Sequence, residues 1–215
     1  MTFAERDHRP NIIVFGVGHS GTTLLAKMLF ALGWNQGESP DAADEDYGEH
    51  LKIRQCNRYV LEHKAIPPEA AAILRTLKCP WAIKDPRFVI TLSSWQPVFA
   101  SALEQLPVLL WVIKDLEEVA KSHAIRGEMI GDKPGSHNHT VVELWQLAMT
   151  HYADWPGPKL RLCYRQIAAA TSLFLPNRTP GGPDLLRKKM HEVARLEQAL
   201  AKSQAAVASG ETQRR

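Results

Sequence analysis

The segment at residues 11–34 constrains the fold more than any other, because a glycine-rich loop there joins an apolar run to a helical pattern. The run Ile12–Phe15 is typical of a buried strand, and the leucine spacing over 22–32 predicts an amphipathic helix. Between them, Gly18 and Gly21 can adopt conformations that turn successive N–H groups inward, toward the positive end of that helix. The segment therefore predicts a strand–loop–helix unit that binds a phosphate-like anion.

The loop differs from the common phosphate-binding pattern G-x-x-x-x-G-K-[ST] at one position. Gly16–Thr23 fits that pattern only with Thr22 in place of the lysine. Ser20, Thr22 and Thr23 supply hydroxyl donors, and His19 supplies a ring N–H that could meet a terminal oxyanion. The alternative is a tight turn with a capping threonine, but such a turn needs only one glycine and one cap. Anion binding is therefore favoured.

Composition predicts a single globular domain. The 215 residues are 45% hydrophobic, so we expect one domain over 11–207 between tails at 1–10 and 208–215. The formal net charge of +3, from 26 basic and 23 acidic residues, gives no argument for a nucleic-acid partner. Three widely spaced cysteines fit free thiols in a reducing compartment. With no signal-like N-terminus and no apolar stretch long enough to span a membrane, we expect a cytoplasmic protein.

The order of patterns along the chain predicts the fold class. Short apolar runs alternate with helical patterns, and near-continuous apolar strands between helices indicate a parallel sheet covered on both faces. We therefore expect an α/β fold of three layers, with a central parallel sheet flanked by helices. The expected strands are Ile12–Phe15, Trp81–Ile83, Val108–Ile113 and Leu160–Cys163, and the expected helices cover 22–32, 69–78, 115–125, 141–155 and 184–207.

The loop sequence HSGTTLL resembles the 5′-phosphosulfate loop of sulfotransferases, usually [KR]-S-G-T-T, in which threonine stands at the lysine position. The resemblance, which runs from about 11 to 170, implies a P-loop-like sulfotransferase fold. It also implies that the loop holds the 5′-phosphosulfate of 3′-phosphoadenosine 5′-phosphosulfate (PAPS), without a metal. This chain has histidine where the family has lysine or arginine. The residues that the resemblance places on the 5′-phosphosulfate are Gly18, His19, Ser20, Gly21, Thr22 and Thr23.

A second block, LLWVIKDLEEVAKSH, resembles the 3′-phosphate motif of the same family. Lys114 ends an expected strand, and Ser122 follows eight residues later on an expected helix. A cation at a strand end and a hydroxyl on the following helix can reach the same phosphate. Taken alone, Lys114 would be an ordinary surface lysine. Together with the first block, the pair is expected to bind the 3′-phosphate.

A third block, WAIKDPRFVI, resembles the K-D-P-R segment of bacterial sulfotransferase-family proteins. Lys84 is expected to stabilise charge on the transferred sulfuryl group or its leaving oxygen. For Arg87 two interpretations stay open, a ligand contact or a structural ion pair with Asp85 or Asp115.

A fourth block, YGEHLKIRQ, resembles the glycine–aromatic–acid segment ahead of a helix in those proteins. Sulfuryl transfer to a hydroxyl needs a base, for which Glu49 is the first candidate, His50 the second and Asp46 the third. The alternative is that an acid at a helix start only complements the helix dipole.

These blocks together predict a sulfotransferase that moves the sulfuryl group of PAPS to a hydroxyl or amine by in-line displacement, releasing adenosine 3′,5′-bisphosphate. The expected acceptor is a carbohydrate or a small natural product. The expected catalytic residues are Glu49, His50, Lys84 and His19. Two other classes stay open, a P-loop nucleotide kinase or NTPase and a non-catalytic nucleotide-binding scaffold.

Overall fold

The computed structural model describes residues 9–37, 48–125 and 139–171. The chain divides into two compact units, 1–168 and 169–215, and the described residues belong almost entirely to the first. The helix expected over 184–207, the tail expected at 208–215 and the third base candidate, Asp46, lie outside the described residues.

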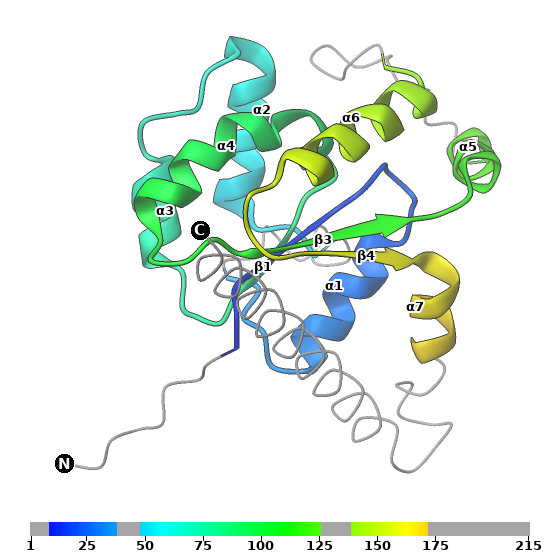
Figure 1. Cartoon of the computed structure of the whole chain (residues 1–215), viewed down its shortest axis with the longest axis horizontal. Coiled ribbons are helices and arrows are strands. Elements are labelled where there is room, and N and C mark those ends of the chain that lie inside the picture. Colours follow the sequence, from blue (N-terminus) through cyan, green and yellow to red (C-terminus); the bar gives the residue numbers. More distant parts are fainter. Residues whose placement is uncertain (1–8, 38–47, 126–138, 172–215) are drawn as a thin grey trace, which may run out of the picture. The chain divides into compact units, whose positions relative to one another are not determined.

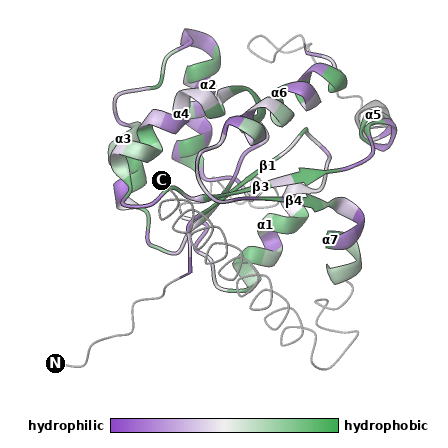
Figure 2. Ribbon diagram, in the orientation of Figure 1, coloured by the Kyte–Doolittle hydropathy of each residue, from purple (hydrophilic) through white to green (hydrophobic). Residues whose placement is uncertain are grey.

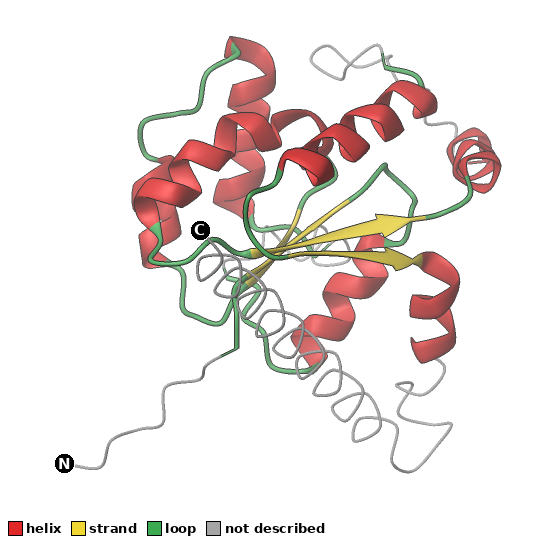
Figure 3. Cartoon of the chain, in the orientation of Figure 1, coloured by secondary structure: helices red, strands yellow, loops and turns green. Residues whose placement is uncertain are grey.

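The centre of the first unit is an all-parallel sheet, drawn in yellow in Figure 3. Its strand order is β2-β1-β3-β4. Each strand lies on one of the four apolar runs, which confirms the predicted α/β fold with a parallel sheet between helices. The strands are β1 (Ile12–Phe15), β2 (Ala82–Lys84), β3 (Val108–Ile113) and β4 (Lys159–Cys163). Of the described helices, none is both long and apolar enough to cross a membrane.

Helices cover both faces of this sheet (Figure 1). Helix α1 contacts β1 and β2 on one face, while α6 contacts β3 on the other and packs on α4, which also contacts α2 and α3. The helices are α1 (Thr22–Ala31), α2 (Leu51–His63), α3 (Ala70–Thr76), α4 (Phe88–Ala102), α5 (Leu116–Ile125), α6 (Val141–Asp154) and α7 (Tyr164–Thr171).

The core lies between the sheet and α4. Phe15 of β1 and Trp95 and Phe99 of α4 are fully buried, and the rings of Trp95 and Phe99 stack with centroids 5.5 Å apart. Figure 2 shows the strands as predominantly hydrophobic along their length. Burial on both faces explains why β1 and β3 appear in the sequence as continuous apolar runs, whereas β4 carries the exposed residues Lys159 and Arg161.

The topology places a ligand-binding edge at the carboxyl ends of β1 and β3. These strands are paired in register from Ile12↔Val108 to Phe15↔Trp111, and β3 continues to Ile113, so their carboxyl ends lie at the same edge of the sheet. Helix α1, which follows β1, packs below the sheet, whereas α6, the second helix after β3, packs above it (Figure 1). In open parallel sheets, ligands bind where the connections diverge in this way. The glycine loop follows β1 and Lys114 follows β3, so both reach this edge.

Candidate functional site

The glycine loop makes a tight turn before α1. The Ser20 N–H donates to the Val17 carbonyl at 3.1 Å, and His19 is left-handed with φ 62°. Gly21, the N-cap of α1, has φ 100° and offers no side-chain cap, and the first turn of α1 carries no acidic residue. The alternative interpretation of the loop, a tight turn with a capping threonine, is therefore not what the structure shows at this helix. The positive N-terminal end of α1 is not neutralised by its own sequence, as an anion site requires.

Ser20 gives a second indication that the loop holds a ligand. Its side chain is 2% exposed, and its hydroxyl oxygen is buried with no hydrogen-bond partner among the described residues. The hydroxyl faces Gly16, because a Cβ added to Gly16 would stand 2.8 Å from Ser20 Oγ and 2.6 Å from the Val112 carbonyl oxygen. A buried hydroxyl without a partner is costly, so an oxygen of a bound anion would satisfy it.

Lys114 and Ser122, the two residues predicted to bind a 3′-phosphate, lie in contact. Lys114 follows β3 and Ser122 lies on α5, and Lys114 Nζ is 3.4 Å from Ser122 Oγ. The Ser122 hydroxyl also donates to the Glu118 carbonyl at 2.7 Å. A carboxylate oxygen of Glu118 lies 3.8 Å from Lys114 Nζ.

Tyr164 links this pair to the glycine loop. A Cβ added to Gly21 would collide with the Tyr164 ring, so the ring lies directly on the backbone of Gly21. Lys114 Nζ lies 4.9 Å from the centroid of the same ring, within range of a cation–π contact. One aromatic side chain therefore contacts both predicted phosphate-binding elements.

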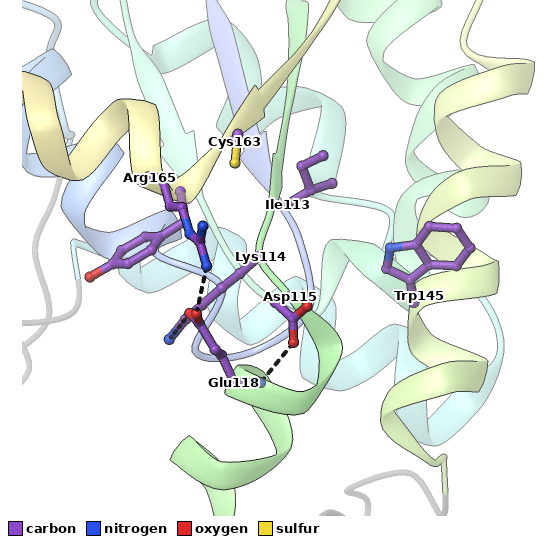
Figure 4. A pocket seen from close by; sticks show the side chains of 8 residues that line it. Ile113, Lys114, Asp115, Glu118, Trp145, Cys163 and Arg165 are labelled. Carbon is purple, nitrogen blue, oxygen red and sulfur yellow. Dashed lines mark hydrogen bonds and ion pairs between the residues drawn. The ribbon is translucent and has the colours of Figure 1, made fainter.

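A cavity of about 410 Å³ opens at the carboxyl ends of β3 and β4 (Figure 4). Lys114, Glu118 and Arg165 form a group of charges in it, and Trp145 of α6 lies across from them. The full lining is Ile113, Lys114, Asp115, Glu118, Trp145, Cys163, Tyr164 and Arg165.

A buried ion network stands at the end of β2. Lys84 Nζ lies 3.0 Å from Glu49 Oε1, and Arg87 Nη1 lies 3.1 Å from Glu49 Oε2. Burial alone would raise the pKa of Glu49, but the charges of Lys84 and Arg87 outweigh it and hold the pKa below its ordinary value of 4.5. Glu49 is therefore ionised at neutral pH and weakly basic. Lys84 pairs in register with Val14, two residues before the glycine loop begins.

Asp85 anchors the other side of this network. Its carboxylate accepts hydrogen bonds from the Arg87 N–H at 2.8 Å, from Arg87 Nη1 at 2.9 Å and from Asn57 Nδ2 at 2.8 Å. Complete burial raises the pKa of Asp85, against the charge of Arg87 and together with the nearby charge of Glu49. Of the two interpretations of Arg87, the structure shows the ion pair with Asp85 and adds a second pair with Glu49.

The two adjacent base candidates have different surroundings. His50 is buried and caps α2, where its Nδ1 accepts the Ile53 N–H at 3.5 Å. In a neutral ring this acceptor role puts the proton on Nε2. Glu49 forms ion pairs with Lys84 and Arg87. The assignment of Glu49 or His50 as the base stays a prediction.

The structure brings four of the predicted residues together in two pairs. Glu49 and Lys84 form an ion pair, and Lys114 contacts Ser122. The members of the loop, Gly18, His19, Ser20, Gly21, Thr22 and Thr23, lie on the turn and on the first residues of α1.

Sequence reasoning missed Tyr164, Glu118 and Arg165. Tyr164 and Arg165 come directly after an expected strand, which is the same signal that identified Lys84 and Lys114. Glu118 stands four residues after Lys114, so it faces that lysine once a helix forms.

The described residues contain no group of three or more His, Cys, Asp or Glu side chains arranged to hold a metal ion.

No family model and no curated protein matches the chain. Among solved structures, the chain is similar to the unliganded crystal structure of a sugar kinase from Janibacter sp. HTCC2649, at 16% sequence identity. The match covers 80% of this chain and 97% of the kinase chain, with a TM-score of 0.38. A likeness of this size carries no argument about activity.

Proposed function

We propose that the chain is a sulfotransferase that uses PAPS. The observation that carries the proposal is the meeting of Lys114 and Ser122 at 3.4 Å, beside a glycine loop that has no lysine of its own. The two elements correspond to the two phosphate-bearing ends of one nucleotide, and Tyr164 contacts both.

The loop side of the site fits a 5′-phosphosulfate. The open N-terminus of α1 and the unpartnered Ser20 hydroxyl would receive anionic oxygens, and Thr22 stands where a kinase would place its lysine. PAPS supplies the activated sulfuryl group. The chain supplies its position and its electrostatic environment, which are the main contributions of proteins to such displacements.

The proposed catalytic side is the network at the end of β2. Glu49 fixes the buried ammonium of Lys84 through a 3.0 Å ion pair, and Lys84 adjoins the strand that leads into the loop. In this proposal Lys84 and His19 stabilise charge on the transferred group. Glu49 and His50 are the proposed acceptors of the proton, and a hydroxyl or amine of a carbohydrate or small natural product is the proposed nucleophile.

Calorimetric titration with adenosine 3′,5′-bisphosphate, beside ATP with magnesium, tests the proposal. We expect the bisphosphate to bind, and we expect Lys114→Ala and Ser122→Ala to weaken it, the lysine change by about tenfold, since it removes a charge-assisted contact. Lys121→Ala is the matched control, because Lys121 lies on α5 next to Ser122, has a side chain that is 68% exposed and pairs with Glu117.

The outcomes separate the three classes of function. Binding of ATP with magnesium and none of the bisphosphate would exclude the proposal in favour of a kinase or NTPase. Binding of the bisphosphate without transfer from PAPS to any member of an acceptor panel would favour a nucleotide-binding scaffold.

A further inference from the structure

Glu118 occupies the charged part of the cavity with both of its carboxylate oxygens. Its Oε2 lies 3.8 Å from Lys114 Nζ, and its Oε1 lies 3.4 Å from Arg165 Nη2 (Figure 4). The lysine follows β3 and the arginine belongs to α7, so one carboxylate bridges cations from two separate segments. A carboxylate that bridges two cations in a cavity occupies the place that a bound anion would take.

If the Glu118 side chain turned out of the cavity, the balance of charge there would change. Asp115 is engaged elsewhere, because its Oδ1 accepts the backbone N–H groups of Glu117 at 2.9 Å and Glu118 at 3.2 Å and so caps α5. Glu118 is 43% exposed and can turn into solvent without breaking that cap. Without its carboxylate, two cations would face one acid in the cavity.

We propose that the Glu118 carboxylate competes with a bound phosphate for Lys114. When the phosphate displaces Glu118, Arg165 is released from its ion pair and binds the phosphate as a second cation. The inference rests on the proposed function and deepens it, because the incoming group is the 3′-phosphate of the nucleotide. A phosphate on Lys114 repels the Glu118 carboxylate at the same point. Arg165 then loses its partner and turns its guanidinium to the phosphate.

This exchange adds an arginine to a phosphate site that otherwise has only the lysine at the end of β3. Lysine offers a compact charge, whereas arginine offers a planar fork that can hold two oxygens of one phosphate. Arg165 would supply that fork from α7. It is a binding residue that the sequence motifs do not reveal.

The test is calorimetry of the full chain with adenosine 3′,5′-bisphosphate and with adenosine 5′-monophosphate, which lacks the 3′-phosphate. We expect Glu118→Gln to tighten the bisphosphate about two- to fivefold, the size set by losing one partly exposed ion pair, and to leave the monophosphate unchanged. Glu117→Gln is the matched control. It removes the same charge from the adjacent residue, whose pair with Lys121 is exposed on both sides.

Arg165 is tested in the Glu118→Gln background, where its own ion pair is already gone. There Arg165→Ala should weaken the bisphosphate by at least about threefold. Arg161→Ala, at an exposed arginine of β4 that does not line the cavity, should change nothing.

Each outcome decides something different. Equal effects of Glu118→Gln and Glu117→Gln, equal tightening of both nucleotides, or no effect of Arg165→Ala would overturn the inference while bisphosphate binding upheld the proposed function. Binding of the bisphosphate by Glu118→Gln alone would support it, with the carboxylate blocking the site fully. Binding by neither protein would overturn both.

Discussion

Glu49 is the residue on which the buried charges of this molecule depend. Two cations, Lys84 and Arg87, lie within 3.1 Å of its oxygens, and Arg54 Nε lies 3.9 Å away. The Lys84 side chain is only 4% exposed, so removing the Glu49 carboxylate would leave the Lys84 ammonium buried without this counter-ion. The loss of one partner from a buried pair costs more than the pair contributes, because it leaves an uncompensated charge.

We therefore expect Glu49→Gln to lower the free energy of unfolding by about 3 kcal/mol at neutral pH, measured by urea denaturation. Because the pKa of folded Glu49 lies below 4.5, its contribution is fully present above that pH and is lost as the pH falls through the folded pKa. The difference between wild type and variant should accordingly shrink below about pH 4. An exposed acid, Glu117, provides the control, and a Glu49→Gln penalty no larger than that of Glu117→Gln would refute the role of the network.

Helices α1 and α6 show how the N-terminus of an element reflects its task. Helix α6 begins with a complete capping box, in which Glu143 N donates to Thr140 Oγ1 at 3.2 Å and Thr140 N donates to Glu143 Oε2 at 2.6 Å. Helix α1 begins at Thr22, and its N-cap residue Gly21 provides no side-chain cap. A cap saturates the free N–H groups, whereas their availability in α1 is what an anion site needs.

We expect Thr140→Ala to destabilise the protein by about 1 kcal/mol, the usual cost of losing an N-cap. Thermal unfolding of the variant measures this cost. Thr150→Ala is the matched control on the same helix. Thr150 is exposed, and its hydroxyl only donates a hydrogen bond to the Gln146 carbonyl at 3.1 Å. An equal loss in both variants would mean that the box does not stabilise α6.

At the scale of the whole molecule, Asn57 ties α2 to the segment that joins β2 and α4. This side chain is fully buried, donates to Asp85 at 2.8 Å, and accepts from Thr91 Oγ1 at 2.6 Å and Trp95 Nε1 at 2.7 Å. All of its partners are buried, so they cannot turn to water when it is removed.

Asn57→Ala should therefore cost about 3 kcal/mol or more in urea unfolding, because it leaves several buried polar groups without this partner. Thr91→Val, which removes one donor at nearly constant volume and keeps the Trp95 bond, should cost less. If the two variants were equally stable, the hydrogen bonds of Asn57 would not account for the stability of this junction.

The strands show how much of the fold the sequence specifies. All four expected runs lie on strands. The bounds of Ile12–Phe15 and Val108–Ile113 were predicted without error, because these two strands are buried on both faces and are therefore apolar throughout. Helices α1 and α6 ended within one residue of their expected boundaries, since each carries an amphipathic stripe.

Helix α4 was not predicted from the sequence pattern. Its buried residues recur at helical spacing, but it contains Pro97, β-branched residues and two adjacent serines, which are poor helix formers. Contacts with α2, α3 and α6 determine that it is helical.

The sequence by itself determined the parallel sheet, the loop after β1 and the spacing that brings Lys114 to Ser122, because these depend on neighbours along one strand and its following helix. Only the tertiary structure decided that Tyr164 lies on Gly21, that Glu118 bridges Lys114 and Arg165, and that Glu49 neutralises Lys84. These contacts join segments that meet only when separate strands end at one edge of the sheet. Local patterns carry no information about which side chains face each other there.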